Sequence, residues 1–142
     1  MATVRQILEK KGNHVWTITP DRSVYDALRL MGEKEIGALA VVEEERVVGV
    51  ISERDYARKV VLKGKMSRET QVREIMTSPV LAVGPEQSVA ECMAIMTERR
   101  VRHLPVLEEG ALVGIISQGD LVKSIIDEQQ FIIGQLENYI VY

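Results

Sequence analysis

Apolar and polar residues follow the same order twice along this chain. A short apolar run is followed by a stripe with i, i+3, i+4, i+7 spacing, which is typical of an amphipathic helix. Two β-rich runs joined by an acidic turn come next, and the chain then turns into another helix. The first copy comprises 15–18, the stripe Val24, Ala27, Leu28 and Met31, 38–42, 47–51 and the helix start 52–55; the second comprises 80–83, the stripe Val89, Cys92, Met93 and Met96, 104–107, 112–116 and 117–120.

The two copies are related by a shift of 65 positions. Val15–Tyr56 aligns without a gap to Val80–Leu121, and 15 of the 42 aligned residues are identical. Self-similarity of this kind indicates duplicated units that share a core. We therefore predict an α/β (α+β) fold with two tandem βαββα repeats that form one pseudo-two-fold module. Repeat 1 is expected at 1–64, repeat 2 at 65–126 and a C-terminal helical extension at 127–142.

Segments outside the aligned copies complete the predicted organisation. A helical lead precedes each copy, at Val4–Leu8 and Val72–Met76, with three extra residues after the first lead. Leu62–Gln71, rich in Lys, Ser and Gly, is the predicted linker. The last helix keeps an apolar face from Ile125 to Ile140, which is more than one small unit can easily cover. We expect a homodimer contact there; intramolecular packing and a partner-protein site are the alternatives.

Composition narrows the classes of function. The chain has 142 residues, of which 46% are hydrophobic and 27% are charged, as in an ordinary folded protein. A net charge of −3 and an aromatic content of 4% argue against a nucleic-acid surface. The single cysteine allows no internal disulfide, and no signal-peptide core or membrane-length apolar run is evident. We expect a cytoplasmic protein with neither nucleic-acid nor membrane partners.

The motif Gly-x-x-Ser-x-x-Asp occurs once in each copy, at Gly49–Asp55 and Gly114–Asp120. It predicts a strand that ends at a helix start, where free N–H groups and the helix dipole attract an anion such as phosphate. The Asp carboxylate can accept hydrogen bonds from the two hydroxyl groups of a ribose. The alternative is that Ser and Asp form only a helix cap, although both copies also keep the Gly, and Asp rather than Glu.

The doubled motif, with Ile75-Met76-Thr77 before the second copy and Arg102-His103-Leu104-Pro105-Val106 at its strand, resembles a tandem pair of CBS domains, or Bateman module. The resemblance covers nearly the whole chain, and the long last helix is similar to that of small stand-alone members. It implies that an adenosine compound binds in two symmetry-related clefts between the repeats. AMP, ADP, ATP and NAD(H) are the expected ligands, S-adenosylmethionine is less favoured, and no metal is required.

The resemblance also implies roles for individual positions. Asp55 and Asp120 would hold ribose hydroxyl groups. Ser52 and Ser117 would contact ribose or phosphate, and Arg102-His103 would face the phosphates. The remaining candidate ligand-binding residues, most of them expected against adenine, are Val15, Thr17, Ile36, Gly37, Ala38, Thr77, Val80, Val101 and Pro105.

The two clefts are not expected to be equivalent. Gly37-Ala38 occupies the positions that Arg102-His103 has in the second copy, so one cleft lacks those cationic partners and should differ in affinity. Arg54, Arg58 and Lys59 are candidates to supply positive charge to the site of the first copy. The alternative for these three residues is a solvated basic helix face.

Catalysis is not predicted. Cys92 lies on a core stripe, and two histidines with one cysteine offer little for a transition-metal site at His103. Trp16 could stack on a base or pack against the fold. We therefore expect a sensor that passes its ligand state to a separate partner protein. The alternatives are a dimerisation scaffold with vestigial ligand sites and a small nucleotide-processing enzyme, although the chain has no phosphate loop of the Gly-x-x-x-x-Gly-Lys type.

Overall fold

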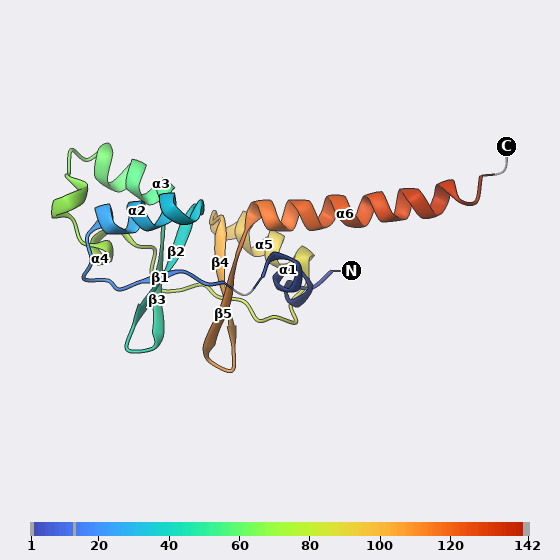
Figure 1. The fold of residues 1–142 in the computed structure, drawn as a ribbon, viewed down its shortest axis with the longest axis horizontal. Helices are drawn as coiled ribbons and strands as arrows, with labels where there is room; N and C mark the ends of the chain where they lie inside the picture. Colours follow the sequence, from blue (N-terminus) through green and yellow to red (C-terminus); the bar gives the residue numbers. More distant parts are fainter. Residues whose placement is uncertain (1, 13, 141–142) are drawn as a thin grey trace.

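The computed structural model describes residues 2–12 and 14–140, which form two similar lobes and one projecting helix (Figure 1). The first lobe contains β1 (Thr17–Ile18), α2 (Val24–Lys34), β2 (Ala38–Glu43), β3 (Arg46–Ser52), α3 (Glu53–Tyr56), the π-helical turn η1 (Ala57–Val61), the 3-10 turn η2 (Ser67–Glu69) and α4 (Val72–Ile75). The second lobe contains α1 (Val4–Lys11), α5 (Val89–Arg99), β4 (His103–Glu108), β5 (Ala111–Ser117) and α6 (Gln118–Glu137). The predicted mixed α/β architecture with two repeats and a long C-terminal helix is confirmed.

The sheets of the two lobes differ by one strand. In the first lobe β1 runs parallel to β2, which pairs antiparallel with β3; in the second, β4 and β5 form an antiparallel pair. The strand expected at 80–83 is reduced to a single parallel bridge between Val83 and Val106. The preceding pair in the first lobe is Thr17 with Ala40, and Pro105 occupies the position equivalent to Ala40. Because proline has no N–H, the ladder cannot extend there.

Each lead helix packs into the core of the other repeat. Val4, Ile7 and Leu8 of α1 are buried with the apolar residues of the second copy. Val72 and Ile75 of α4 are buried with those of the first copy. The chain therefore crosses between the lobes once before each copy begins, and this exchange holds the two lobes against each other.

The motif glycines lie where these lead segments approach the strands most closely. A Cβ atom built on Gly49 would lie 2.7 Å from Met76 Sδ and 3.1 Å from the Thr77 carbonyl oxygen. A Cβ atom built on Gly114 would lie 2.6 Å from Leu8 Cδ2. The glycine of the motif therefore has a packing explanation in both copies, independent of any ligand.

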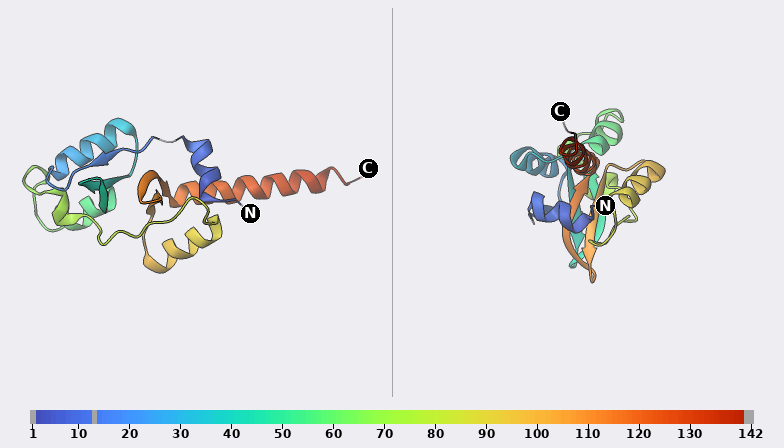
Figure 2. Two further views of the ribbon diagram at one scale, coloured as in Figure 1. Left: turned by 90° about the horizontal axis from the view of Figure 1, so that it is seen from below. Right: turned by 90° about the vertical axis from the view of Figure 1, so that its right-hand side faces the viewer.

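Helix α6 extends well past the second lobe (Figure 2). Leu121 near its start is buried, whereas the large apolar residues farther along are exposed, among them Ile126, Phe131, Ile133 and Leu136. Within the described residues, no helix is long and apolar enough to span a lipid bilayer.

Candidate ligand-binding clefts

A cavity of about 210 Å³, here called the first cleft, lies where β3 and the start of α3 meet the loop before β4. It gathers nine of the predicted residues and five others from both repeats. The predicted residues are Gly37, Ser52, Arg54, Asp55, Thr77, Val80, Val101, Arg102 and His103, and the others are Val50, Glu53, Pro79, Leu81 and Arg100. Arg100 could have been anticipated, because it belongs to the run Arg99-Arg100-Val101-Arg102.

Asp55 is held at the floor of the first cleft by a helix cap. Its Oδ2 accepts hydrogen bonds from the Ser52 N–H at 3.0 Å and from the Ser52 hydroxyl at 3.1 Å. Its Oδ1 forms an ion pair with Lys59 Nζ, which lies 3.0 Å away. A carboxylate offers about four acceptor positions, so Asp55 keeps capacity for a further donor at Oδ1. Ser52 and Asp55 therefore do form the helix cap that the alternative predicted, and this cap orients the Asp55 carboxylate.

Positive charge converges at the same cleft. Like-charge repulsion from Arg58, then partial burial and repulsion from Arg102, lower the pKa of Arg54. Arg54 and Arg102 both line the cavity, together with Arg100. Guanidinium groups that repel one another at the mouth of a cavity are stabilised by an anion between them, and phosphate suits them because they bind it bidentately.

His103 lies between the two halves of the molecule. Its ring is 3.6 Å from the position that a Cβ atom would take on Gly37. Burial, followed by the nearby charge of Lys11, lowers the pKa of His103, although Asp120 and Asp55 act in the opposite direction. The imidazole is therefore mainly neutral near pH 7, and the positive charge of the first cleft comes from arginine.

The second motif copy forms the same cap but meets a different cation. Asp120 Oδ2 accepts a hydrogen bond from the Ser117 N–H at 2.8 Å, and Asp120 N–H donates to the Ser117 hydroxyl at 3.0 Å. Lys11 of α1 forms an ion pair with the same Oδ2 at 2.7 Å. Burial opposes ionisation of Asp120, but the Lys11 ammonium and the Ser117 hydrogen bonds lower its pKa. Sequence analysis missed Lys11, which lies among the extra residues after the first lead.

The other predicted residues do not line the first cleft. Ala38 and Pro105 are buried in β2 and β4, and Val15 and Ile36 are half-buried. Thr17 lines a separate surface depression beside Arg22 and Asp26. The Lys34 ammonium lies over the Trp16 ring, with Nζ 4.1 Å from the ring centroid. Among the described residues, no cluster of three or more His, Cys, Asp or Glu side chains is arranged to hold a metal ion.

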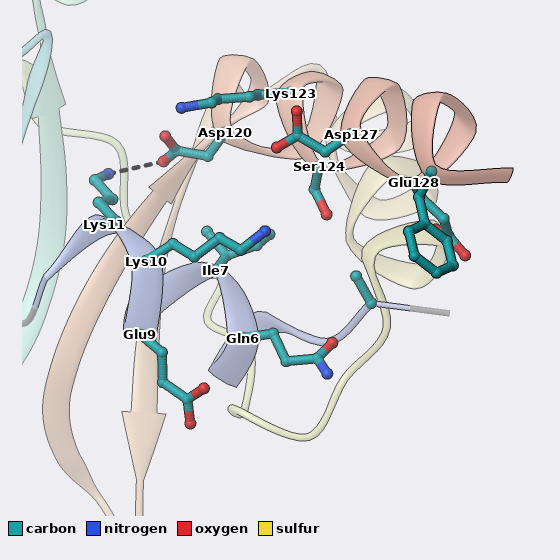
Figure 3. A pocket seen from close by; sticks show the side chains of 12 residues that line it. Gln6, Ile7, Glu9, Lys10, Lys11, Asp120, Lys123, Ser124, Asp127 and Glu128 are labelled. Carbon is teal, nitrogen blue, oxygen red and sulfur yellow. Dashed lines mark hydrogen bonds and ion pairs between the residues drawn. The ribbon is translucent and has the colours of Figure 1, made fainter. Parts of the chain in front are cut away.

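A larger cavity lies elsewhere, between α1 and α6 (Figure 3). This groove has a volume of about 790 Å³ and includes Lys10, Lys11, Asp120, Lys123 and Asp127. Its lining mixes acidic and basic side chains with the apolar residues Ala2, Ile7 and Phe131, whereas the first cleft combines a cap-oriented carboxylate with several arginines. Size alone therefore does not identify the site, and we favour the first cleft on its chemistry.

Comparison with known proteins gives consistent results. A family model described as CBS domain matches residues 4–62 and 72–127. A CBS-domain protein from Burkholderia ambifaria has a solved structure that is 55% identical, covers 90% of this chain and 96% of that one, and superposes with a TM-score of 0.86. The mitochondrial CBS domain-containing protein CBSX3 of Arabidopsis thaliana is 36% identical over 97% of this chain and 71% of its own length.

One further solved structure shares the fold at lower identity. The CBS domain pair of protein MJ0100 is 23% identical over 90% of this chain and 98% of that one, with a TM-score of 0.80. That structure was determined in complex with 5′-methylthioadenosine and S-adenosyl-L-methionine.

Proposed function

Because the chain belongs to the CBS-domain family, we propose that it binds an adenosine ligand in the first cleft and transmits the ligand state to a partner protein. The single observation that carries the proposal is the pairing of a cap-oriented carboxylate with converging arginines in one cavity. The complex of MJ0100 with two adenosine compounds shows that a pair with this fold accepts such ligands.

Each part of a nucleotide has a chemical counterpart in the first cleft. Asp55 Oδ1 is the acceptor for a ribose hydroxyl group, and Arg54 and Arg102 are the donors for phosphate. Val80 and Val101 offer apolar surface for adenine. The cavity is smaller than the roughly 300–1,000 Å³ typical of ligand pockets, so a nucleotide would fill it and extend through its mouth.

The proposal is tested by calorimetric and thermal-shift titration with AMP, ADP, ATP, NAD, NADH and S-adenosylmethionine. A ligand at 100 times its Kd stabilises the native state by about 2.7 kcal/mol, so binding must raise the melting temperature. We expect saturable binding of at least one compound, its loss in Asp55→Ala and its retention in Asp120→Ala, the matched change in the other copy. Asp55→Asn, which keeps an acceptor for the cap, separates loss of ligand from loss of fold.

A second variant pair tests the phosphate end. Arg102→Gln removes a charge-assisted hydrogen bond worth about 1.5 kcal/mol, or roughly tenfold in affinity. We expect that loss for AMP or ATP and no change for adenosine. Arg29→Gln on the exposed face of α2 serves as the charge-matched control, because Arg29 pairs only with Glu33 among the interactions described. Absence of saturable binding by every adenosine compound would overturn the proposal.

The apolar face of α6 carries a second proposal, that two copies of the chain pair through this helix. Ile126 and Ile133 are 46% and 54% exposed, and they lie two turns apart on one side of α6. A self-complementary face of this kind suits a two-fold dimer. Light scattering after gel filtration should give a dimer for the native chain, a monomer for Ile133→Asp and a dimer for Gln135→Asp, because Gln135 lies on the opposite side of α6. A monomeric native chain would refute the pairing.

We propose binding without catalysis for this chain. The motif serines act as helix caps, and Cys92 is buried with a pKa that burial raises. A thiol in that state is a poor nucleophile. Turnover of ATP or NAD by the purified chain would contradict this part of the proposal.

A further inference from the structure

The two lead helices differ in length by one turn. α1 has 8 residues and α4 has 4. Their apolar contacts nevertheless coincide, because Leu8 lies against Gly114 as Met76 lies against Gly49. Ile75 at the end of α4 corresponds to Ile7, so the extra turn of α1 consists of Leu8–Lys11.

The extra turn changes which group meets the neighbouring strand. After α4, the Thr77 N–H donates to the Val50 carbonyl oxygen at 2.8 Å, and the Val50 N–H donates to the Thr77 carbonyl oxygen at 3.1 Å. Ile115 is the residue of β5 that corresponds to Val50. Its carbonyl oxygen accepts a hydrogen bond from Lys11 Nζ at 2.9 Å. A side-chain ammonium thus stands where the first cleft has a backbone N–H.

The same ammonium neutralises the carboxylate that corresponds to Asp55. Lys11 Nζ lies 2.7 Å from Asp120 Oδ2, and the Lys11 and Asp120 side chains are 36% and 24% exposed (Figure 3). The charge of Lys11 also acts on His103, which lines the first cleft from the opposite side. Lys11 is therefore positioned between the second motif and the junction of the two repeats.

Asp55 also has a lysine partner, but in a different arrangement. Lys59 comes from the next turn of the same helical segment, binds Oδ1, and donates to the Ile75 carbonyl oxygen at 2.8 Å. Lys59 lies outside the lining of the first cleft, so the cavity stays open beside Asp55. Lys11 instead reaches Asp120 from another helix and occupies the oxygen that Ser117 also bonds.

We propose that Lys11 is an internal occupant of the second cleft, the site at Ile115, Ser117 and Asp120 that corresponds to the first cleft, so that one chain binds one adenosine ligand. The inference rests on the proposed function, since it takes Asp120 to be the ribose acceptor of the second cleft. A nucleotide that approaches Asp120 must first separate the ion pair and remove the donor from the Ile115 carbonyl oxygen. The two clefts of the duplicated module thereby differ through one inserted helical turn.

The test is calorimetric stoichiometry with AMP and with ATP on wild type, Lys11→Met and Lys11→Met/Asp120→Ala. We expect one site per chain in wild type, two in Lys11→Met and one again in the double variant. The affinity of the first site should change by no more than about twofold, because distant sites are nearly additive. Lys10→Met is the matched control: Lys10 is the exposed neighbour on the same turn, and its variant should keep one site.

Each outcome bears on one of the two proposals. Two sites in wild type, one of them lost in Asp120→Ala, or one site in Lys11→Met, would overturn the role of Lys11. Loss of first-cleft binding in Asp55→Ala would still support the proposed function. Loss of an existing second site in Lys11→Met would show that Lys11 recruits phosphate and would also overturn the closure. No saturable binding in any variant overturns both. Lys11→Gln keeps a donor for the Ile115 carbonyl oxygen, so it controls for misfolding of the Lys11→Met variant.

Discussion

Replacing Gly49 by Ala tests whether the motif glycine is a packing residue. The new Cβ atom would lie 2.7 Å from Met76 Sδ, 3.0 Å from Met76 Cγ and 3.1 Å from the Thr77 carbonyl oxygen. The thioether can turn away, but the Thr77 carbonyl accepts the Val50 N–H and cannot recede without lengthening that bond. Overpacking of this kind costs about 1–3 kcal/mol, and the reduced entropy of the unfolded chain offsets about 0.4–1 kcal/mol. We expect a net destabilisation of about 1–2 kcal/mol.

Thermal unfolding followed by circular dichroism measures this effect. For a chain of this size, 1 kcal/mol corresponds to a shift of about 3 °C, so Gly49→Ala should melt about 3–6 °C lower. Gly114→Ala should lose less, because its Cβ atom meets only the Leu8 side chain, and a side chain can adjust. Gly32→Ala in α2 is the control, because nothing lies within 4 Å of the new methyl group. It should raise stability by about 0.5–1 kcal/mol.

The essential result is that Gly49→Ala lowers the melting temperature whereas Gly32→Ala raises it. If Gly49→Ala melts at or above the wild-type temperature while Gly32→Ala is stabilised, close packing of Met76 and Thr77 does not explain the motif glycine. The glycine would then have to be required by a ligand that approaches the backbone, and the affinity of Gly49→Ala for AMP would be the next quantity to measure.

Two further predictions concern the junction and the caps. His103 should titrate below the ordinary histidine value of about 6.5 in NMR spectra assigned with His14→Gln, and Lys11→Met should raise its pKa. In the wild-type chain the lowered pKa of His103 means that the unfolded state binds more protons than the folded state. The free energy of unfolding should therefore fall as pH decreases through about 6.5, and His103→Gln should reduce that dependence. Ser117→Ala removes the cap of α6 and should cost about 1 kcal/mol, whereas Ser124→Ala on the same helix should change stability little; equal losses would contradict the capping role.

The duplication that is visible in the sequence is also present in the backbone hydrogen bonds of the two copies. The shift of 65 positions relates the Glu53 N–H, which donates to the Gly37 carbonyl oxygen at 3.1 Å, to the Gln118 N–H, which donates to the Arg102 carbonyl oxygen at 2.8 Å. Helix stripes and strand pairs could be predicted within one or two residues, because a local period and flanking turns define them. The family followed from the order of the motifs, and the matches at 4–62 and 72–127 confirm it.

The exchange of the lead helices could not be predicted from local patterns. A short helix with buried Val4 and Leu8 has the same apolar face whichever core it joins, so only tertiary packing decides between them. The reduced first strand of the second copy, in contrast, could have been predicted from the sequence. Pro105 stands where the first copy has Ala40, and proline lacks the N–H that would extend the strand pairing. The residue boundaries proposed for the repeats, the cytoplasmic location and the roles of individual ligand-binding residues stay predictions.

The comparison of the two copies explains why equal motifs need not make equal sites. Both copies place an Asp on a Ser cap, and both supply that Asp with a lysine. Helix length contributes to the difference, because α4 ends at Ile75 and Thr77 then pairs with Val50, whereas α1 continues to Lys11. The arginines are likewise gathered at Asp55, because Arg100 and Arg102 of the second copy and Arg54 of the first copy all line the first cleft. Insertion and substitution therefore act in the same direction: the first cleft has arginines for phosphate beside Asp55, whereas in the second copy a lysine from another helix occupies the Asp120 oxygen that the Ser117 cap also bonds.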